Sequence, residues 1–276
     1  MANEPAYDAE AFRRFEQEGW ADVAETYAAT FGQVTGQAIG PLLDAVQAAP
    51  GSRLLDIACG AGALTAAAAG RGAEAVGVDF VPNMLALAAR LHPGIDFRPG
   101  DAEALTFGGG SFDAVVCCFG ILHFPRPGQA IAEAFRVLTS GGRYALTAWC
   151  PGGPENARGL VEAAVRAHGT LDVDLPEGPP VSRFGSAEAC REVFEEAGFA
   201  EFETQELPIV YRLARAEELI DNLIKGTARN RGLLVRQAPQ QLARIREAVV
   251  EHAAPFAVAG GFEIPNPALL AMGRKP

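Results

Sequence analysis

The stretch from Leu54 to Thr65, which reads LLDIACGAGALT, decides the fold of this chain. An apolar run leads into two glycines one residue apart, Gly60 and Gly62, and a helix-like segment follows. This order is typical of the first strand, turn and helix of a Rossmann-type nucleotide-binding unit. The dinucleotide-binding form of this turn has a third glycine at the position of Thr65. The turn therefore predicts a nucleotide-containing ligand and leaves its kind open.

Outward from this turn, short apolar strands alternate with helical patterns. Strands are expected at 53–58, 74–79, 95–98, 113–118 and 143–149, and helices at 62–70, 82–91 and 127–138. Short, almost wholly apolar strands between helices indicate a parallel sheet covered on both faces. The flanking patterns predict helices at 8–31, 33–48, 186–197 and 215–254, strand-like residues at 199–213 and a last strand at 267–273.

Composition narrows the possible partners. The chain has 276 residues, a formal net charge of −11 and 49% hydrophobic residues, enough for a full core. Such an acidic chain is repelled by nucleic acid and anionic membranes, so neither is an expected partner. The start, MANEPAYDAE, does not read as a signal peptide, and five cysteines without Cys-x-x-Cys spacing favour the cytoplasm. The four histidines form no metal-binding pair, so no metal is expected.

Three aspartates stand beside the turn or at expected strand ends. Asp79 ends the second strand about 20 residues after the turn, where a carboxylate accepts hydrogen bonds from both hydroxyls of a ribose. Asp101 follows the third strand and can accept from an adenine amino group. Asp56, inside the first strand, would accept from a ligand ammonium or orient the loop, and an anion there repels a pyrophosphate. The three aspartates thus suit a ligand with an adenine, a ribose and an amino-acid end but no phosphate. S-adenosylmethionine fits this description better than NAD.

Five segments in order then carry a family resemblance. They are LLDIACGAG (54–62), VGVDFVPNML (76–85), GDAEALTF (100–107), SFDAVVCCFGILHF (111–124) and AFRVLTSGGRYALTAW (134–149). In these segments the chain resembles class I S-adenosylmethionine-dependent methyltransferases, the group that includes ubiquinone/menaquinone C-methyltransferases and many small-molecule enzymes. The resemblance implies a doubly wound, Rossmann-like seven-stranded sheet, mostly parallel, with one antiparallel strand near the edge and a helical cap.

The resemblance also implies roles for individual residues. The residues expected to contact the methionine and ribose portions of S-adenosylmethionine are Ala58, Cys59, Gly60 and Gly62. Phe80 and Met84 are expected to flank its adenine. Asp79 holds the ribose, Asp101 with the Ala102 amide reads the adenine edge, and Cys118 and Phe119 face the methionine amine through their backbone. The family usually has glycine at the position of Ala58, whose methyl group is expected to crowd the turn slightly without preventing binding.

Three further features bear on catalysis and on substrate binding. His123 follows the fourth strand, where a methyl acceptor would lie, and an imidazole can act there as a general base or simply line the pocket. Trp20, Tyr27 and Phe31 predict either a lid helix over the cofactor sulfonium, with Tyr27 as its best contact, or a helix docked by its apolar face. Residues 212–246 hold eight basic and three acidic side chains, which a solvated helix face explains better than attraction of an anionic substrate.

The expected organisation is a helical lid at 1–49, a cofactor-binding core at 50–150, and at 151–276 the rest of the sheet with a helical substrate cap at about 215–262. The expected activity is O-, C- or N-methylation of a small organic molecule by a monomer or homodimer, with S-adenosylhomocysteine as product. Two alternatives stay open: an S-adenosylmethionine-binding cyclase or rearrangement enzyme on the same fold, and a nicotinamide-dependent oxidoreductase.

Overall fold

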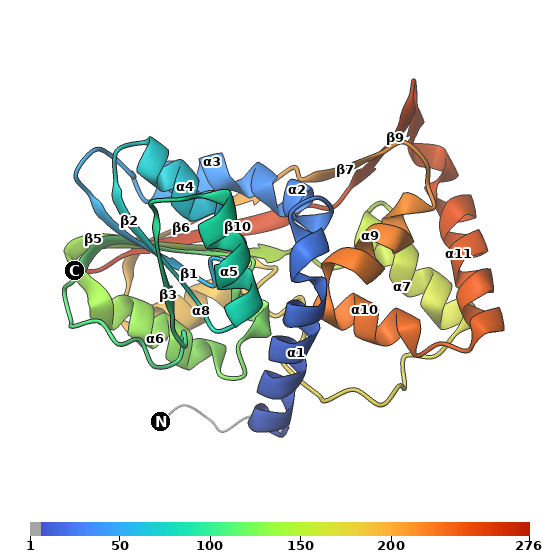
Figure 1. The fold of residues 1–276 in the computed structure, drawn as a ribbon, viewed down its shortest axis with the longest axis horizontal. Helices are drawn as coiled ribbons and strands as arrows, with labels where there is room; N and C mark the ends of the chain where they lie inside the picture. Colours follow the sequence, from blue (N-terminus) through green and yellow to red (C-terminus); the bar gives the residue numbers. More distant parts are fainter. Residues whose placement is uncertain (1–6) are drawn as a thin grey trace.

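A computed structural model describes residues 7–276, so the first six residues of the expected lid lie outside it. Its centre is a seven-stranded sheet with the order β3-β2-β1-β4-β5-β10-β6 (Figure 1). The strands are β1 (Arg53–Ile57), β2 (Glu74–Asp79), β3 (Asp96–Pro99), β4 (Phe112–Cys118), β5 (Leu138–Trp149), β6 (Ala200–Leu207) and β10 (Ala268–Arg274). Both pairings of β10 are antiparallel, and the pairings among β1 to β5 are parallel. The predicted sheet, with one antiparallel strand near its edge, is confirmed.

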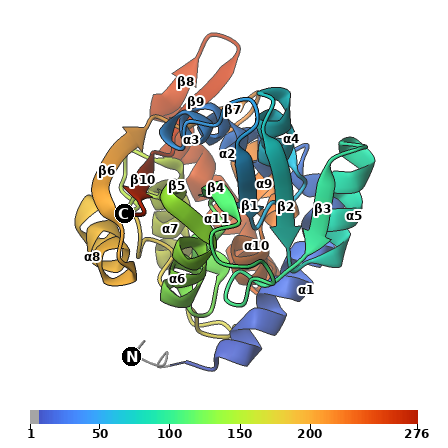
Figure 2. The same ribbon diagram turned by 90° about the vertical axis from the view of Figure 1, so that its left-hand side faces the viewer.

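Helices cover both faces of this sheet (Figure 2). One face packs against α3 (Ile39–Ala45) and α4 (Ala63–Gly70), and the other against α6 (Pro127–Val137) and α8 (Ala187–Ala197). The alternation of a strand explains this division, because Leu54 belongs to the first apolar core and its neighbour Leu55 to the second. Helix α5 (Pro82–Leu91) contacts β2 and β3.

A second body of structure lies beyond the carboxyl ends of the central strands. It contains α7 (Ala157–His168), α9 (Glu218–Gly226), α10 (Ala228–Val235) and α11 (Pro239–Ala253), at the right of Figure 1. A small sheet of β7 (Val210–Leu213), β9 (Gly261–Pro265) and β8 (Ala257–Val258) borders these helices. The sequence patterns did not predict α7 or the β8–β9 hairpin. The expected helical insertion at 215–262 therefore ends in strands, and the division into lid, core and cap stays a prediction.

The strand-like region at 199–213 is two strands, which belong to different sheets. Strand β6 ends at Leu207 and pairs with β10, whereas β7 begins at Val210 and pairs with β9. Pro208 lies between them and has no backbone N–H to continue the ladder. The chain can therefore leave the central sheet here and enter the second body.

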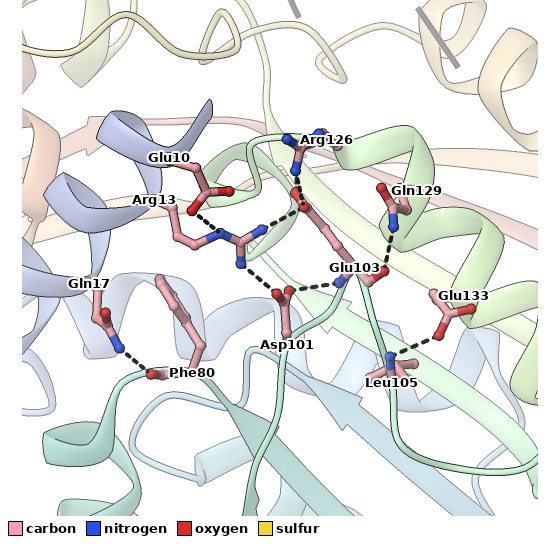
Figure 3. A network of polar contacts seen from close by, with 10 residues as sticks. All are labelled: Glu10, Arg13, Gln17, Phe80, Asp101, Glu103, Leu105, Arg126, Gln129 and Glu133. Carbon is pink, nitrogen blue, oxygen red and sulfur yellow. Dashed lines mark hydrogen bonds and ion pairs between the residues drawn. The ribbon is translucent and has the colours of Figure 1, made fainter. Parts of the chain in front are cut away.

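Helix α1 (Ala9–Tyr27) runs between the sheet and the second body and contacts α5 on one side and α9 and α10 on the other (Figure 1). Ion pairs attach it to the loop after β3, because Arg13 Nη1 lies 2.6 Å from Asp101 Oδ2 and Arg13 Nη2 lies 2.6 Å from Glu103 Oε2 (Figure 3). Gln17 Nε2 also donates to the Phe80 carbonyl at 2.9 Å. The short α2 (Phe31–Thr35) and the 3₁₀ turn Gly36–Ala38 then lead to α3. Across residues 7–276, no helix combines the length and apolarity needed to span a bilayer.

Candidate functional site

A pocket with an empty volume of about 570 Å³ lies where β1, β2 and β4 end, next to α1. The strand order reverses between β1 and β4, which is where open α/β sheets bind ligands. Nine of the fourteen residues predicted to bind the cofactor or act in catalysis line it: Tyr27, Ala58, Gly60, Asp79, Phe80, Met84, Cys118, Phe119 and His123. The structure therefore brings together groups from α1, from three strand ends and from the loop after β4.

Asp79 closes the turn after β1 from its position at the end of β2. Its Oδ2 accepts from the Gly60 N–H and its Oδ1 from the Val81 N–H, both at 2.9 Å. Burial raises the pKa of Asp79, while the bonds from Val81 and Gly60 lower it. The carboxylate is thus positioned by backbone donors, and its remaining lone pairs are available to a ligand in the pocket.

Asp56 lies behind the turn and does not line the pocket. The side chain faces α4, where Thr65 Oγ1 donates to its Oδ2 at 2.7 Å, and Oδ1 is buried without a hydrogen-bond partner. Thr65 stands at the position where a dinucleotide-binding turn has its third glycine. In this chain the Thr65 hydroxyl forms the hydrogen bond that fixes Asp56. Burial raises the pKa of Asp56 to about 7. This geometry is consistent with orientation of the turn, one of the two roles predicted for Asp56.

The unusual pKa of Asp56 predicts how stability depends on pH. From about pH 4 to about pH 7 the folded protein keeps a proton on Asp56 that the unfolded chain has released, so the free energy of unfolding falls as pH rises. In Asp56→Asn this decline should become shallower, while Asp79, whose pKa burial also raises, still contributes in the same direction. Urea unfolding at pH 5 and pH 8 measures this decline. At pH 8 the free energy of unfolding of the variant should be about 1–3 kcal/mol higher than that of the wild type. An unchanged pH dependence would contradict a shifted Asp56.

Four further predicted residues do not line this pocket. Cys59 and Gly62 shape the turn from behind, since the Cys59 carbonyl accepts from the Gly62 N–H at 2.9 Å and Gly62, at φ +81°, caps α4. Asp101 binds Arg13 and accepts from the Glu103 N–H at 2.9 Å (Figure 3). Ala102, the next residue, is buried. The adenine role of Asp101 and Ala102 stays a prediction.

Two of the four non-glycine residues with positive φ in the described part of the chain lie at the pocket. Ala58 and Phe119, at the ends of β1 and β4, have φ values of +57° and +58°, in the left-handed region that favours glycine. Gly120 follows, and a Cβ there would lie 2.6 Å from the Ala58 Cβ. Strained non-glycine residues persist where surrounding structure fixes them, and they cluster at functional sites.

The adjacent cysteines of β4 face opposite sides of the sheet. Cys118 lines the pocket and Cys117 is buried in the core on the α6 side. Burial raises the pKa of Cys118 to about 12. Neither thiol is placed to act as a nucleophilic thiolate.

His123 pairs with a buried glutamate that the sequence patterns did not indicate as functional. Its Nδ1 lies 2.8 Å from Glu16 Oε2, which also accepts from Trp20 Nε1 at 3.1 Å. Glu16 is fully buried, and Arg229 Nε lies 3.8 Å from its other oxygen. A carboxylate accepts hydrogen bonds, so Nδ1 is assigned as the donor in this pair, and Nε2 is the ring nitrogen that Glu16 does not contact. That arrangement is typical of a histidine that acts as a base.

Comparison with known proteins identifies the family. The family model described as "Methyltransferase domain" matches residues 55–146. A demethylmenaquinone methyltransferase from Chlorobaculum parvum is 34% identical over 176 residues, which are 58% of this chain and 72% of that protein. The chain belongs to the class I S-adenosylmethionine-dependent methyltransferases.

Further comparisons agree with this family. A demethylmenaquinone methyltransferase from Renibacterium salmoninarum is 44% identical over 105 residues, 38% of this chain and 44% of the relative. The chain spans about half the length of several curated relatives that it matches. Phosphoethanolamine N-methyltransferase 2 from Haemonchus contortus, solved with phosphomonomethylethanolamine and S-adenosylhomocysteine, shares the fold with a TM-score of 0.57 at 19% identity, over 96% of this chain and 60% of that one.

The structure has a second cavity next to the first. Its empty volume is about 1160 Å³, and it lies among α7, α9, α10 and β7. Four residues line both cavities: Trp20, Phe31, His123 and Trp149. His123 therefore stands at the junction of the two cavities.

Proposed function

We propose that the protein transfers a methyl group from S-adenosylmethionine to an oxygen, carbon or nitrogen of a small organic acceptor. The observation that carries this proposal is the chemistry of the first pocket. Of the described residues that line it, none is lysine or arginine, while Asp79 and several aromatic rings are present. A ligand with a sulfonium, an ammonium and no phosphate suits such a wall, whereas a pyrophosphate does not.

The residues present fit this cofactor. Asp79 would hold the ribose hydroxyls, the backbone of Ala58 to Gly60 would follow the ribose and methionine portions, and Phe80 and Met84 would flank adenine. The backbone of Cys118 and Phe119 would face the methionine amine. Bound there, S-adenosylmethionine supplies an electrophilic methyl group on a sulfonium.

The aromatic side chains of α1 support the lid hypothesis. Trp20 and Tyr27 meet edge to face with ring centroids 5.6 Å apart, and both line the first pocket. Tyr27 is held by a 3.0 Å bond between its hydroxyl and Thr35 Oγ1. Their π faces would stabilise a nearby cation, and α1 would exclude water from the reacting atoms.

For acceptors with a hydroxyl group, His123 would act as the general base. Glu16 would orient the ring through Nδ1 and stabilise the imidazolium when Nε2 takes the proton. Trp20, four residues after Glu16 on the same helix, holds the Glu16 carboxylate in place with a hydrogen bond from its indole N–H. Glu16 is a positioning residue in this scheme, since it acts through His123.

Two glycines of the turn predict separable effects. At Gly60 (φ +53°) a Cβ would meet only Tyr27 Cε1, at 3.9 Å, so it would occupy pocket space that the cofactor needs. At Gly62 (φ +81°) it would lie 2.4 Å from Phe97 Cζ. Gly60→Ala should therefore lower S-adenosylmethionine affinity at least about tenfold with about 1 kcal/mol lost stability. Gly62→Ala should lower stability by about 1–3 kcal/mol. Calorimetry and urea unfolding measure both, and normal binding by Gly60→Ala would place the cofactor elsewhere.

An acceptor screen tests the proposed activity. The protein is incubated with S-adenosylmethionine and a panel of hydroxyaryl, amine and activated-methylene compounds, and released S-adenosylhomocysteine and methylated product are measured together. Equal amounts of the two are expected for at least one acceptor. Conversion of an acceptor without any methyl incorporation would instead support the cyclase or rearrangement alternative.

We also infer action in the cytoplasm on a diffusible acceptor. All five cysteines are unpaired, and Cys59, Cys117 and Cys190 are buried, which fits a reducing compartment. No group of three or more metal-ligating side chains occurs within residues 7–276. Monomer and homodimer both remain compatible with the proposal.

A further inference from the structure

The second cavity is mostly apolar but contains one cation that the protein does not neutralise. Its apolar wall includes Val161, Val165, Tyr211, Leu219, Leu223 and Leu233. Arg158, in the first turn of α7, lines the same cavity. Its Nη1 is buried without a hydrogen-bond partner, and within residues 7–276 no carboxylate oxygen lies within 4 Å of its guanidinium. The residue as a whole is half-buried. Removing part of a charged group from water without a partner is unfavourable, so this nitrogen requires an explanation.

The neighbouring charged groups are already engaged. Glu162, one turn after Arg158, lies 2.6 Å from the exposed Arg166. Arg229, the second cation of the cavity, lies 3.8 Å from Glu16, donates to the Pro179 carbonyl at 2.9 Å and stacks over Phe12. Burial lowers the pKa of Arg158, Glu162 raises it and Arg229 lowers it further. Arg158 thus has a second cation, Arg229, in its surroundings, and the negative charge of Glu162 does not form an ion pair with it.

The backbone at Arg158 is fixed. Asn266 Oδ1 accepts from the Arg158 N–H at 3.2 Å, and the Asn156 side chain caps α7 by accepting from the Gly159 N–H at 2.9 Å. Asn266 lines the same cavity. The base of the arginine is therefore held between α7 and the segment before β10, while its guanidinium lacks a partner.

We propose that the methyl acceptor is a largely apolar molecule with a carboxylate that Arg158 binds, while its methylated atom lies near His123. The inference rests on the proposed function and names its substrate class. A guanidinium fits a carboxylate through paired N–H donors. A monoanion matches the single unneutralised cation, whereas a phosphate dianion would need a second one, and Arg229 is engaged by Glu16. The apolar walls accommodate the rest of the acceptor.

Matched ligand pairs test this inference. The probes are hydroxyaryl carboxylates, such as 6-hydroxy-2-naphthoate, a hydroxybiphenyl carboxylate and a hydroxyphenylalkanoate, each beside its carboxamide. Calorimetry with protein saturated in S-adenosylhomocysteine measures their affinity. At least one carboxylate should bind at least about tenfold more tightly than its amide, the difference that one charge-assisted interaction produces. Arg158→Gln should abolish the preference, Arg158→Lys should keep part of it, and Arg166→Gln on the same helix should leave it unchanged.

The outcomes separate this inference from the proposed function. S-adenosylhomocysteine is titrated first, and failure of that step would count against the methyltransferase assignment itself. Normal S-adenosylhomocysteine binding with equal affinity for acid and amide, with no carboxylate bound, or with the preference intact in Arg158→Gln would overturn the role of Arg158. Unchanged S-adenosylhomocysteine affinity and thermal unfolding in Arg158→Gln would show that the variant is folded.

Discussion

Replacing His123 with alanine is expected to lower turnover about 10²–10⁴-fold on a hydroxyl acceptor while S-adenosylmethionine affinity stays nearly unchanged. The ring stands at the junction of the two cavities, and its Nδ1 is bound to buried Glu16, which leaves Nε2 to accept a proton. Steady-state kinetics measures the turnover, and calorimetric titration measures the S-adenosylmethionine affinity.

Two controls sharpen this result. His168→Ala removes an exposed histidine at the end of α7 and should leave turnover unchanged. Glu16→Gln keeps a similar shape but removes the charge, so turnover should fall to a level between wild type and His123→Ala. A His123→Ala enzyme within about threefold of wild type would remove the base from the mechanism and leave catalysis to positioning.

Asp79→Ala is expected to weaken S-adenosylmethionine binding at least about tenfold. Each charge-assisted bond to a ribose hydroxyl contributes about 1.5–3 kcal/mol, and the alanine variant loses both. It also leaves the Gly60 and Val81 N–H groups without their acceptor, so the turn itself becomes less well defined. Isothermal titration of wild type and variant with S-adenosylmethionine measures the loss.

A matched aspartate at the other end of the sheet provides the control. Asp113, near the start of β4, binds Arg53 at 2.7 Å, and its side chain is 41% exposed. Asp113→Ala should keep cofactor affinity, so that a loss confined to Asp79→Ala locates the site at the carboxyl ends of the strands. Unchanged affinity in Asp79→Ala would show that the ribose is held by other groups.

The core of the fold was predictable because its signals are local. The apolar run Leu54–Ile57, the turn at Gly60 and Asp79 at the next strand end each follow from spacing within one βαβ unit. Nine predicted residues therefore meet in one pocket. The small sheet was not predictable in this way, since β7 and β9 are about 50 residues apart and their pairing depends on tertiary contacts.

The acceptor side was predicted least well. Glu16 lies one turn from both Phe12 and Trp20 on α1, so a carboxylate within the apolar stripe was the available signal. Its partner His123 is 107 residues away, and no sequence period joins the two. The basic region at 212–246 was interpreted as a solvated face. Arg212, Arg215 and Arg246 do pair with acidic groups at or near the surface, whereas Arg229 turns inward to the second cavity.

Two separate calorimetric titrations of the purified protein, one with S-adenosylmethionine and one with NADH, test the central claim most directly. The acidic, aromatic pocket without lysine or arginine predicts one S-adenosylmethionine site per chain and no measurable heat from NADH at the same concentration. Tighter binding of NADH, or no binding of S-adenosylmethionine by folded protein, would contradict the account.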